Sequence, residues 1–286
     1  VLLKGKPVSK SIRENLKIEI DILNRTHNII PKLVAILVGE NPASQIYVNS
    51  KSKAFRRMKC NSETINLPVD ISQDDLINII HKVNNDDSVH GVLVQLPLPK
   101  GLDSRKVLQS VSPEKDVDGF HPINIGYLFE GNPQFIPCTP GGIIEILDYY
   151  KIPSEGCYTV IIGRSNIVGK PMFGLLAQKL RKGNSTVTMC HTGTKDISYF
   201  TKQADLLIVA AGVPEYIKGH MLSTGVHIID VGINRVEDDS EKGYKLVGDV
   251  DFTDCFNKAA SITPVPGGVG PMTITMLLSN TVISAK

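Results

Sequence analysis

Short apolar runs recur along the chain and predict the strands of parallel sheets. Residues 32–38 (KLVAILV) and 89–95 (VHGVLVQ) are mostly apolar, as strands buried on both faces are. Between them, Asn41-Pro42 has the form of an N-cap followed by proline in the first helical turn, and it opens a helix that continues to Arg57. Strands that alternate with helices predict β-α-β units, and therefore an α/β fold.

A second series of apolar runs follows the first. Residues 158–163, 185–190, 205–210 and 226–230 predict four further strands with helical connections, the pattern of a doubly wound, Rossmann-like dinucleotide-binding sheet. We place the boundary between the two series near residues 139–142, before an amphipathic helix over residues 143–150. After a Pro/Gly loop, the apolar segment 272–282 predicts a last helix.

Length and composition favour an enzyme of about two domains. The chain has 286 residues, 42% of them hydrophobic, and a net charge of +2 with basic and acidic residues interspersed, so nothing in it indicates a nucleic-acid or membrane surface. Its longest apolar runs are too short to span a bilayer. Five cysteines without a C-x-x-C pair indicate neither a disulfide framework nor a metal site. We expect reduced thiols and a cytoplasmic location, with organellar import left open because the chain begins at Val1.

Three Pro/Gly-rich runs carry a family resemblance. They are Gln95-Leu96-Pro97-Leu98-Pro99, residues 116–122 (DVDGFHP) and residues 264–271 (PVPGGVGP). Proline fixes φ, and glycine lets the backbone approach a ligand closely. Together the runs resemble the methylenetetrahydrofolate dehydrogenase/cyclohydrolase family. The resemblance implies NADP-dependent oxidation of 5,10-methylenetetrahydrofolate to the methenyl form, followed by hydrolysis to 10-formyltetrahydrofolate.

The same resemblance implies a domain organisation. It runs from Gly5-Lys6 to the segment after Pro271. It implies an α/β folate-binding catalytic domain made of residues 1–140 and 267–286, interrupted by a Rossmann-like NADP-binding domain of residues 141–266. The C-terminal helix would therefore return to the first domain. The resemblance also implies a homodimer that forms through the nucleotide domain.

Tyr47 and Lys51 are the candidate catalytic pair. They lie four residues apart on the predicted helix, so both project from one face. By spacing alone, a basic helix of this kind is more often a solvated surface. The resemblance reverses that preference, because Y-x-x-x-K is the catalytic signature of the family and Gln95 is the residue that holds the lysine ammonium.

Asp118 is the candidate ligand of the pterin ring. A carboxylate can accept paired N–H donors in strong, directional hydrogen bonds. Asp116 offers the same chemistry, and both residues could instead cap a turn. We prefer Asp118, because it is the second Asp of the D-V-D-G run of the family. The resemblance adds Pro266, Gly267 and Gly268 as substrate-binding residues.

The candidate cofactor loop is G-R-S-N-I-V-G-K-P at residues 163–171. It lies between a strand and a helix, where a pyrophosphate meets backbone N–H groups, but it is not a G-x-G-x-x-G match. By itself it could equally be an ordinary turn. The resemblance identifies G-R-S-x-x-V-G-x-P as the phosphate loop of the family, and implies cofactor contacts from Gly163, Arg164, Ser165, Ile167, Val168 and Gly169.

The end of the next predicted strand favours NADP over NAD. That strand ends in Cys190-His191-Thr192, without the acidic residue that usually binds the ribose 2′-hydroxyl of NAD. Arg164 and Thr192 are available for a 2′-phosphate instead. His191 could contact the cofactor or be satisfied by the backbone, and the resemblance adds Ile233 to the cofactor residues.

Two other functions remain to be weighed. A two-domain NADP dehydrogenase of the shikimate type shares the predicted architecture, but has no need of Y-x-x-x-K together with Q-L-P-L-P. A folate- or nucleotide-binding protein without catalysis is the second alternative. The presence of Tyr47, Lys51, Gln95 and Asp118 counts against it.

Overall fold

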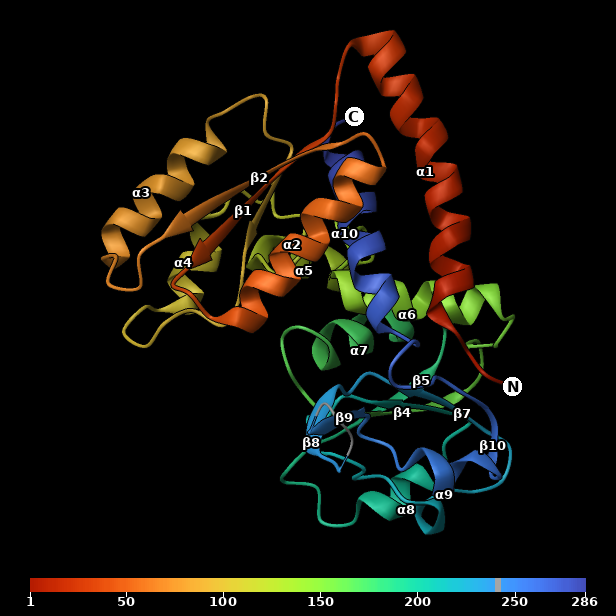
Figure 1. The fold of residues 1–286 in the computed structure, drawn as a ribbon. Helices are drawn as coiled ribbons and strands as arrows, with labels where there is room; N and C mark the ends of the chain where they lie inside the picture. Colours follow the sequence, from red (N-terminus) through yellow and green to blue (C-terminus); the bar gives the residue numbers. More distant parts are fainter. Residues whose placement is uncertain (240–242) are drawn as a thin grey trace. The chain divides into compact units, whose positions relative to one another are not determined.

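The computed structural model describes residues 1–239 and 243–286, which form two compact units (Figure 1). The first, here called the three-strand unit, contains Ser11–Tyr127, Pro133–Cys138 and Ile274–Lys286. The second, the five-strand unit, contains Val1–Lys10, Leu128–Asn132 and Thr139–Thr273. The first residues join the five-strand unit because Leu3 N donates to the carbonyl of Ile262 at 2.9 Å.

The three-strand unit is built on a parallel sheet of order β2-β1-β3. Its strands are β1 (Lys32–Val38), β2 (Asn61–Leu67) and β3 (Gly91–Val94). Strand β1 is buried on both faces, since Leu33, Ala35 and Leu37 belong to one core cluster and the alternating Val34, Ile36 and Val38 to another. This confirms the expected buried strand at residues 32–38.

Helices enclose this sheet on both faces (Figure 1). They are α1 (Gly5–His27), α2 (Pro42–Arg57), α3 (Gln73–Asn84) and α4 (Ser104–Ser110), and the unit also contains most of α5 (Pro122–Glu130). Leu16 of α1 and Phe55 of α2 belong to the cluster around Ala35, whereas Leu76 of α3 and Val107 of α4 belong to the cluster around Ile36. The core thus has one layer of helices on each side of β1.

The five-strand unit contains a parallel sheet of order β10-β7-β6-β4-β5. Its strands are β4 (Tyr158–Ile162), β5 (Thr186–Cys190), β6 (Leu206–Val209), β7 (Val226–Asp230) and β10 (Ala259–Ile262). Numbered along the unit, this is the doubly wound order 2-1-3-4-5, whose switch point lies between β4 and β6. The expected sheet is confirmed, with a fifth strand added.

Four helices, a 3-10 helix and a two-stranded sheet complete the described part of this unit. They are α6 (Cys138–Tyr149), α7 (Gly169–Ala177), α8 (Ile197–Thr201), the 3-10 helix η1 (Gly219–Met221), α9 (Phe252–Phe256) and the antiparallel pair β8 (Asn234–Glu237) and β9 (Tyr244–Val247). Helix α6 corrects the expected start of the helix, because it begins at Cys138 rather than at residue 143. Gly142 is tolerated within this helix because Met272 packs closely against it, and a Cβ on Gly142 would lie 2.5 Å from that of Met272.

Helix α10 (Gly270–Ser284) ends the chain and confirms the predicted return to the first domain. Leu277, Leu278 and Val282 belong to the same core cluster as Leu33 of β1. Asn280 Nδ2 donates to the carbonyls of Val117 and Ile136 at 2.8 and 2.9 Å. Among the helices of residues 1–239 and 243–286, none has the length and apolar character needed to cross a membrane.

Candidate active site and cofactor loop

Lys51 is held by an amide oxygen inside the three-strand unit. Helix α2 begins as expected, because the side chain of Asn41 accepts from Ser44 N at 3.1 Å and Pro42 occupies the first turn. One turn separates Tyr47, which is 52% exposed, from Lys51, which is partly buried. Lys51 Nζ donates to Gln95 Oε1 at 3.1 Å. The contact between Lys51 and Gln95 that the family resemblance implied is therefore present in the structure.

Gln95 is itself fixed from two sides. Its backbone N–H donates to the carbonyl of Ile36 at 2.9 Å, and its Nε2 donates to the carbonyl of Leu96 at 2.6 Å. It directly follows β3, whose neighbour β1 leads into α2. The pair thus lies at the carboxyl edge of the sheet, where the order β2-β1-β3 reverses direction and where α/β sheets bind ligands.

Asp118 completes a charged group with Lys51. Burial raises the pKa of its carboxyl, the positive charge of Lys51 lowers it, and the negative charge of Asp116 raises it further. Cys138 Sγ lies 3.6 Å from Asp118 Oδ1. The following turn needs glycine, because Gly119 has a φ of +75° and a Cβ there would lie 2.9 Å from Pro137 N. Asp118 is thereby held as a partly buried acceptor beside a cation.

Asp116 has a different role, as an internal brace of the same loop. It is 5% exposed, and its Oδ2 accepts from His121 N at 2.7 Å and from Asn124 Nδ2 at 2.9 Å. Burial raises the pKa of Asp116, while these donors lower it. Its carboxylate is engaged within the protein, which supports the choice of Asp118 as the substrate ligand.

We expect Asp116→Ala to lower the free energy of unfolding by about 1.5–3 kcal/mol or more, because it removes hydrogen bonds to a buried charged group. Urea titration followed by circular dichroism measures the change. Asp70→Ala, at an exposed carboxylate of the same unit, is the control and should change stability by less than about 0.5 kcal/mol. Equal effects of the two substitutions would contradict the bracing role.

Sequence reasoning missed two residues that hold the Asp118 loop. Cys138 Sγ lies 3.5 Å from the carbonyl of Val117, and Asn280 Nδ2 donates to the same carbonyl at 2.8 Å. Asn280 is only 2% exposed. Its position within the apolar segment 272–282 was the available signal, because a buried amide needs a hydrogen-bonding partner. Cys138 offered no such signal, and burial raises the pKa of its thiol well above the usual value.

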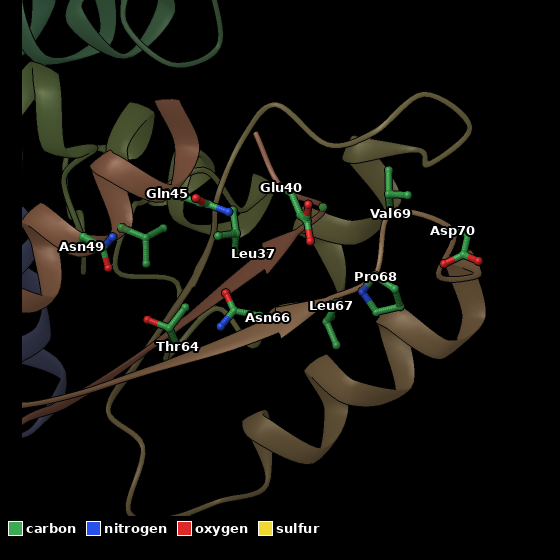
Figure 2. A pocket seen from close by; sticks show the side chains of 12 residues that line it. Leu37, Glu40, Gln45, Asn49, Thr64, Asn66, Leu67, Pro68, Val69 and Asp70 are labelled. Atoms are coloured by element: carbon green, nitrogen blue, oxygen red, sulfur yellow. The ribbon is translucent and has the colours of Figure 1, made fainter. Parts of the chain in front are cut away.

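A large surface cavity of about 1020 Å³ lies on another side of α2 (Figure 2). Gln45 and Asn49 of α2 face Thr64 and Asn66 of β2 across it. Residues 45 and 49 are two positions before Tyr47 and Lys51, and so lie about 160° away around the helix. None of the residues lining this cavity is a predicted site residue.

In the five-strand unit, the loop after β4 has the backbone of a close-approach site. Gly163 has a φ of +117°, and a Cβ there would overlap the carbonyl oxygen of Ala210 at the end of β6. A Cβ on Gly169 would in turn overlap the carbonyl oxygen of Gly163. Both positions therefore require glycine. The loop lies at the switch point between β4 and β6, where a dinucleotide is expected.

The side chain of Ser165 binds backbone N–H groups at the start of α7. Its Oγ accepts from Val168 N at 3.1 Å and from Gly169 N at 3.4 Å. These N–H groups at the start of α7 are thus already engaged, although the sequence offered them to a phosphate. Val168 is 9% exposed and packs inward, whereas Ile167 is 41% exposed. Arg164 is also exposed, so these two side chains have access to a ligand.

The other predicted cofactor residues lie in loops after β5 and β7. His191 Nδ1 accepts from Gly193 N at 3.0 Å, so one ring nitrogen is satisfied by the backbone. Thr192 is exposed and directly follows it. Ile233, which follows β7, is 49% exposed. All three follow the carboxyl ends of parallel strands, as does the Gly163 loop.

Residues Pro266 to Gly268 belong to the five-strand unit. Gly268 N donates to the carbonyl of Pro264 at 2.7 Å, and Gly5 N donates to the carbonyl of Gly267 at 2.9 Å. A Cβ on Gly5 would overlap the carbonyl oxygen of Gly268. The structure therefore fixes this loop within its own unit, and its assignment to the folate site stays a prediction.

Comparison with known proteins identifies the family. Residues 3–118 match the model of the tetrahydrofolate dehydrogenase/cyclohydrolase catalytic domain, and residues 137–286 match that of its NAD(P)-binding domain. The chain is 50% identical over 285 residues to the bifunctional protein FolD of Syntrophobacter fumaroxidans, covering 100% of this chain and 97% of the relative.

Two crystal structures agree with this match. The bifunctional FolD dehydrogenase/cyclohydrolase of Campylobacter jejuni has a TM-score of 0.94 at 51% identity, covering 100% of this chain and 98% of that one. The Trypanosoma brucei enzyme complexed with NADP and an inhibitor has a TM-score of 0.93 at 37% identity, covering 100% and 97%. With two matched domains and full-length relatives, this chain belongs to the tetrahydrofolate dehydrogenase/cyclohydrolase family.

Proposed function

We infer that this protein oxidises 5,10-methylenetetrahydrofolate with NADP and hydrolyses the methenyl product to 10-formyltetrahydrofolate, in one-carbon folate metabolism. The hydrogen bond from Lys51 Nζ to Gln95 Oε1 carries the inference, because it joins two of the proposed catalytic residues beside the charge of Asp118. The relatives named above are bifunctional enzymes of this kind. A binding protein without catalysis would not need a lysine held in this way.

In the oxidation step, the chain mainly positions the substrate. NADP, when bound, accepts a hydride. The nitrogen lone pair of the substrate drives the hydride out, so little acid–base help is needed and orientation is most of the catalysis. Asp118 would hold the pterin through charge-assisted hydrogen bonds, and Tyr47 would present an exposed ring to the same substrate.

Hydrolysis of the methenyl cation makes a greater demand on the side chains. Water adds to the cation, loses a proton, and the ring opens as a ring nitrogen takes up a proton. Lys51 is the group that would transfer these protons: as the neutral amine it would accept one from the added water, and as the ammonium it would return one to the ring nitrogen, while Gln95 holds its Nζ in place. Gln95 therefore acts by aligning Lys51.

We expect Gln95→Leu to slow methenyltetrahydrofolate hydrolysis by about tenfold or more, because a misaligned proton donor loses much of its effect. Loss of the methenyl absorbance, with no nucleotide added, measures this rate. Asn49→Leu is the matched control, because Asn49 is an exposed amide on α2, the helix of Lys51, outside the proposed site. A rate for Gln95→Leu equal to that of Asn49→Leu would show that the hydrogen bond is not used.

The residues of the Gly163 loop fit NADP. Two positions that must be glycine keep side chains away from the loop, and exposed Arg164 and Thr192 offer a cation and a hydroxyl without a neighbouring acid. We propose that both face the 2′-phosphate. Gly163, Ser165, Ile167, Val168, Gly169, His191 and Ile233 would form the remaining cofactor surface.

Arg164→Ala should raise the Michaelis constant for NADP and leave activity with NAD almost unchanged, because only the phosphorylated cofactor loses a charge-assisted contact. Steady-state kinetics with both cofactors measure the two effects. Arg181→Ala is the control, since this exposed arginine of the same unit pairs with Asp148 at 3.1 Å. An equal loss with NAD and NADP would remove Arg164 from the 2′-phosphate site.

Assembly and location are also proposed. We propose a homodimer formed through the nucleotide domain, and no nucleic-acid or membrane partner, in keeping with the net charge of +2. The five free cysteines suit a reducing cytoplasm. Sedimentation of the purified chain tests the dimer.

We propose residues 1–140 with 267–286 as the catalytic domain and residues 141–266 as the NADP-binding domain. We also propose Pro266, Gly267 and Gly268 as folate contacts.

A further inference from the structure

Two buried carboxylates, Asp230 and Asp249, lie among the loops at the carboxyl edge of the five-strand sheet. They are 3% and 0% exposed. Neither was suggested by the sequence, and neither has a part in the chemistry described above. Carboxylates are rarely buried without compensating partners, so their contacts indicate what they do.

Asp249 holds the loop that follows β6. Its Oδ2 accepts from Ala211 N at 2.6 Å and from Gly212 N at 2.8 Å. Its Oδ1 accepts from Asn234 Nδ2 at 2.8 Å, at the start of β8. One side chain thereby ties together two loops that leave neighbouring strands, β6 and β7.

Asp230, the last residue of β7, fixes Asp249 in turn. Its Oδ1 accepts from Asp249 N at 2.9 Å and from Gly232 N at 3.0 Å, and its Oδ2 accepts from Val250 N at 3.0 Å. Burial outweighs these donors and, together with the charge of Asp249, raises the pKa of Asp230 to about 6. The chain thus keeps an acidic pair here against the cost of desolvation.

Two glycines make room for this pair. A Cβ on Gly232 would overlap Asp249 Oδ1, and one on Gly248 would overlap Asp230 Oδ2. The residue after Gly232 is Ile233, a proposed cofactor contact. On the other side, the carbonyl of Ala210 packs against Gly163 of the cofactor loop. Asp249 is therefore linked through residues 210–212 to the Gly163 loop, and through Asn234 to its neighbour Ile233.

We propose that Asp249 is a positioning residue for NADP, which shapes the switch-point crevice by fixing residues 210–212 and 232–234 before the cofactor arrives. Asp230 orients it for that task. Preformed loops lower the ordering cost of binding, so loss of the Asp249 carboxylate should weaken NADP binding. The inference rests on the proposed NADP-dependent activity. Hydrolysis of supplied methenyltetrahydrofolate needs no nucleotide and should be spared.

The test compares four variants of the full chain. Asp249→Ala should raise the Michaelis constant for NADP by about tenfold or more, with methenyl hydrolysis within about twofold of wild type. Asp249→Asn should keep the Michaelis constant for NADP close to the wild-type value. Its amide oxygen can still accept from Ala211 N and Gly212 N, and a flip of the Asn234 amide lets Asn234 accept from the new amide nitrogen. In Gly232→Ala the added methyl group would displace the Asp249 carboxylate, so this variant should also raise the Michaelis constant for NADP. It replaces Asp249→Ala in the test if that variant does not fold.

Asp254→Ala is the matched control. Asp254 Oδ2 accepts from Gly219 N at 2.6 Å in the same unit, and its loss should leave the Michaelis constant for NADP within about twofold of wild type. The proposal is overturned if folded Asp249→Ala behaves like Asp254→Ala, if Asp249→Asn is no better than Asp249→Ala, or if methenyl hydrolysis falls in parallel. A wild-type protein that does not use NADP at all would instead refute the proposed function.

Discussion

Lys51→Met is expected to abolish hydrolysis of methenyltetrahydrofolate while NADP-dependent oxidation of methylenetetrahydrofolate survives. Methionine keeps much of the volume of the lysine stem but cannot transfer a proton, and general acid–base catalysis typically contributes 10²- to 10⁴-fold, on the order of 3–5 kcal/mol. Oxidation depends mainly on positioning. Separate assays of methenyl formation and methenyl decay measure the uncoupling.

Lys53→Met is the matched control, because Lys53 is an exposed lysine two positions along the same helix. Both activities should stay near wild type in that variant. If Lys51→Met retained hydrolysis, the catalytic assignment would be wrong. If a folded Lys51→Met lost both activities equally, Lys51 would be a general substrate ligand instead.

Asp118→Asn should weaken tetrahydrofolate binding by about tenfold or more. The substitution keeps the shape of the side chain but removes its charge, and a hydrogen bond to a charged group is worth about 1.5–3 kcal/mol. NADP binding should be nearly unchanged. Fluorescence titration with a folate ligand and with NADP measures the two affinities.

Asp116→Asn separates the two aspartates of the same loop. Because Asp116 is already engaged by His121 N and Asn124 Nδ2, its substitution should act mainly on stability. A larger loss of folate affinity in Asp116→Asn than in Asp118→Asn, at equal foldedness, would reverse the assignment.

The sequence predicted those strands that consist of continuous apolar runs. The strands at residues 32–38 and 226–230 were predicted at their observed limits, because continuous apolar runs are what buried parallel strands require. Strand β2 was not predicted, since Asn61–Leu67 (NSETINL) lies at the sheet edge, where its residues alternate between exposed and half-buried and form no apolar run. Strand β10 was missed as well, because Ala259–Ile262 (AASI) contains one large apolar residue and so lacks a strong apolar run.

The candidate site divides in the same way. The contact of Lys51 with Gln95 could be anticipated, because a helix and a strand end each carried a recognisable motif. The hydrogen bond from Val168 N to Ser165 Oγ could not be anticipated, since it depends on the exact path of the loop. Asp249 was equally hidden, because its role depends on partners 15 to 38 residues away in the chain.

The most direct test of the proposed function is an absorbance assay of the purified protein with 5,10-methylenetetrahydrofolate, run with NADP and with NAD while the methenyl and 10-formyl products are followed separately. We predict NADP-dependent formation of methenyltetrahydrofolate, a slower reaction with NAD, and conversion of the methenyl product to 10-formyltetrahydrofolate by the same protein. No oxidation with NADP, or a methenyl product that accumulates at its uncatalysed rate of decay, would contradict a bifunctional enzyme.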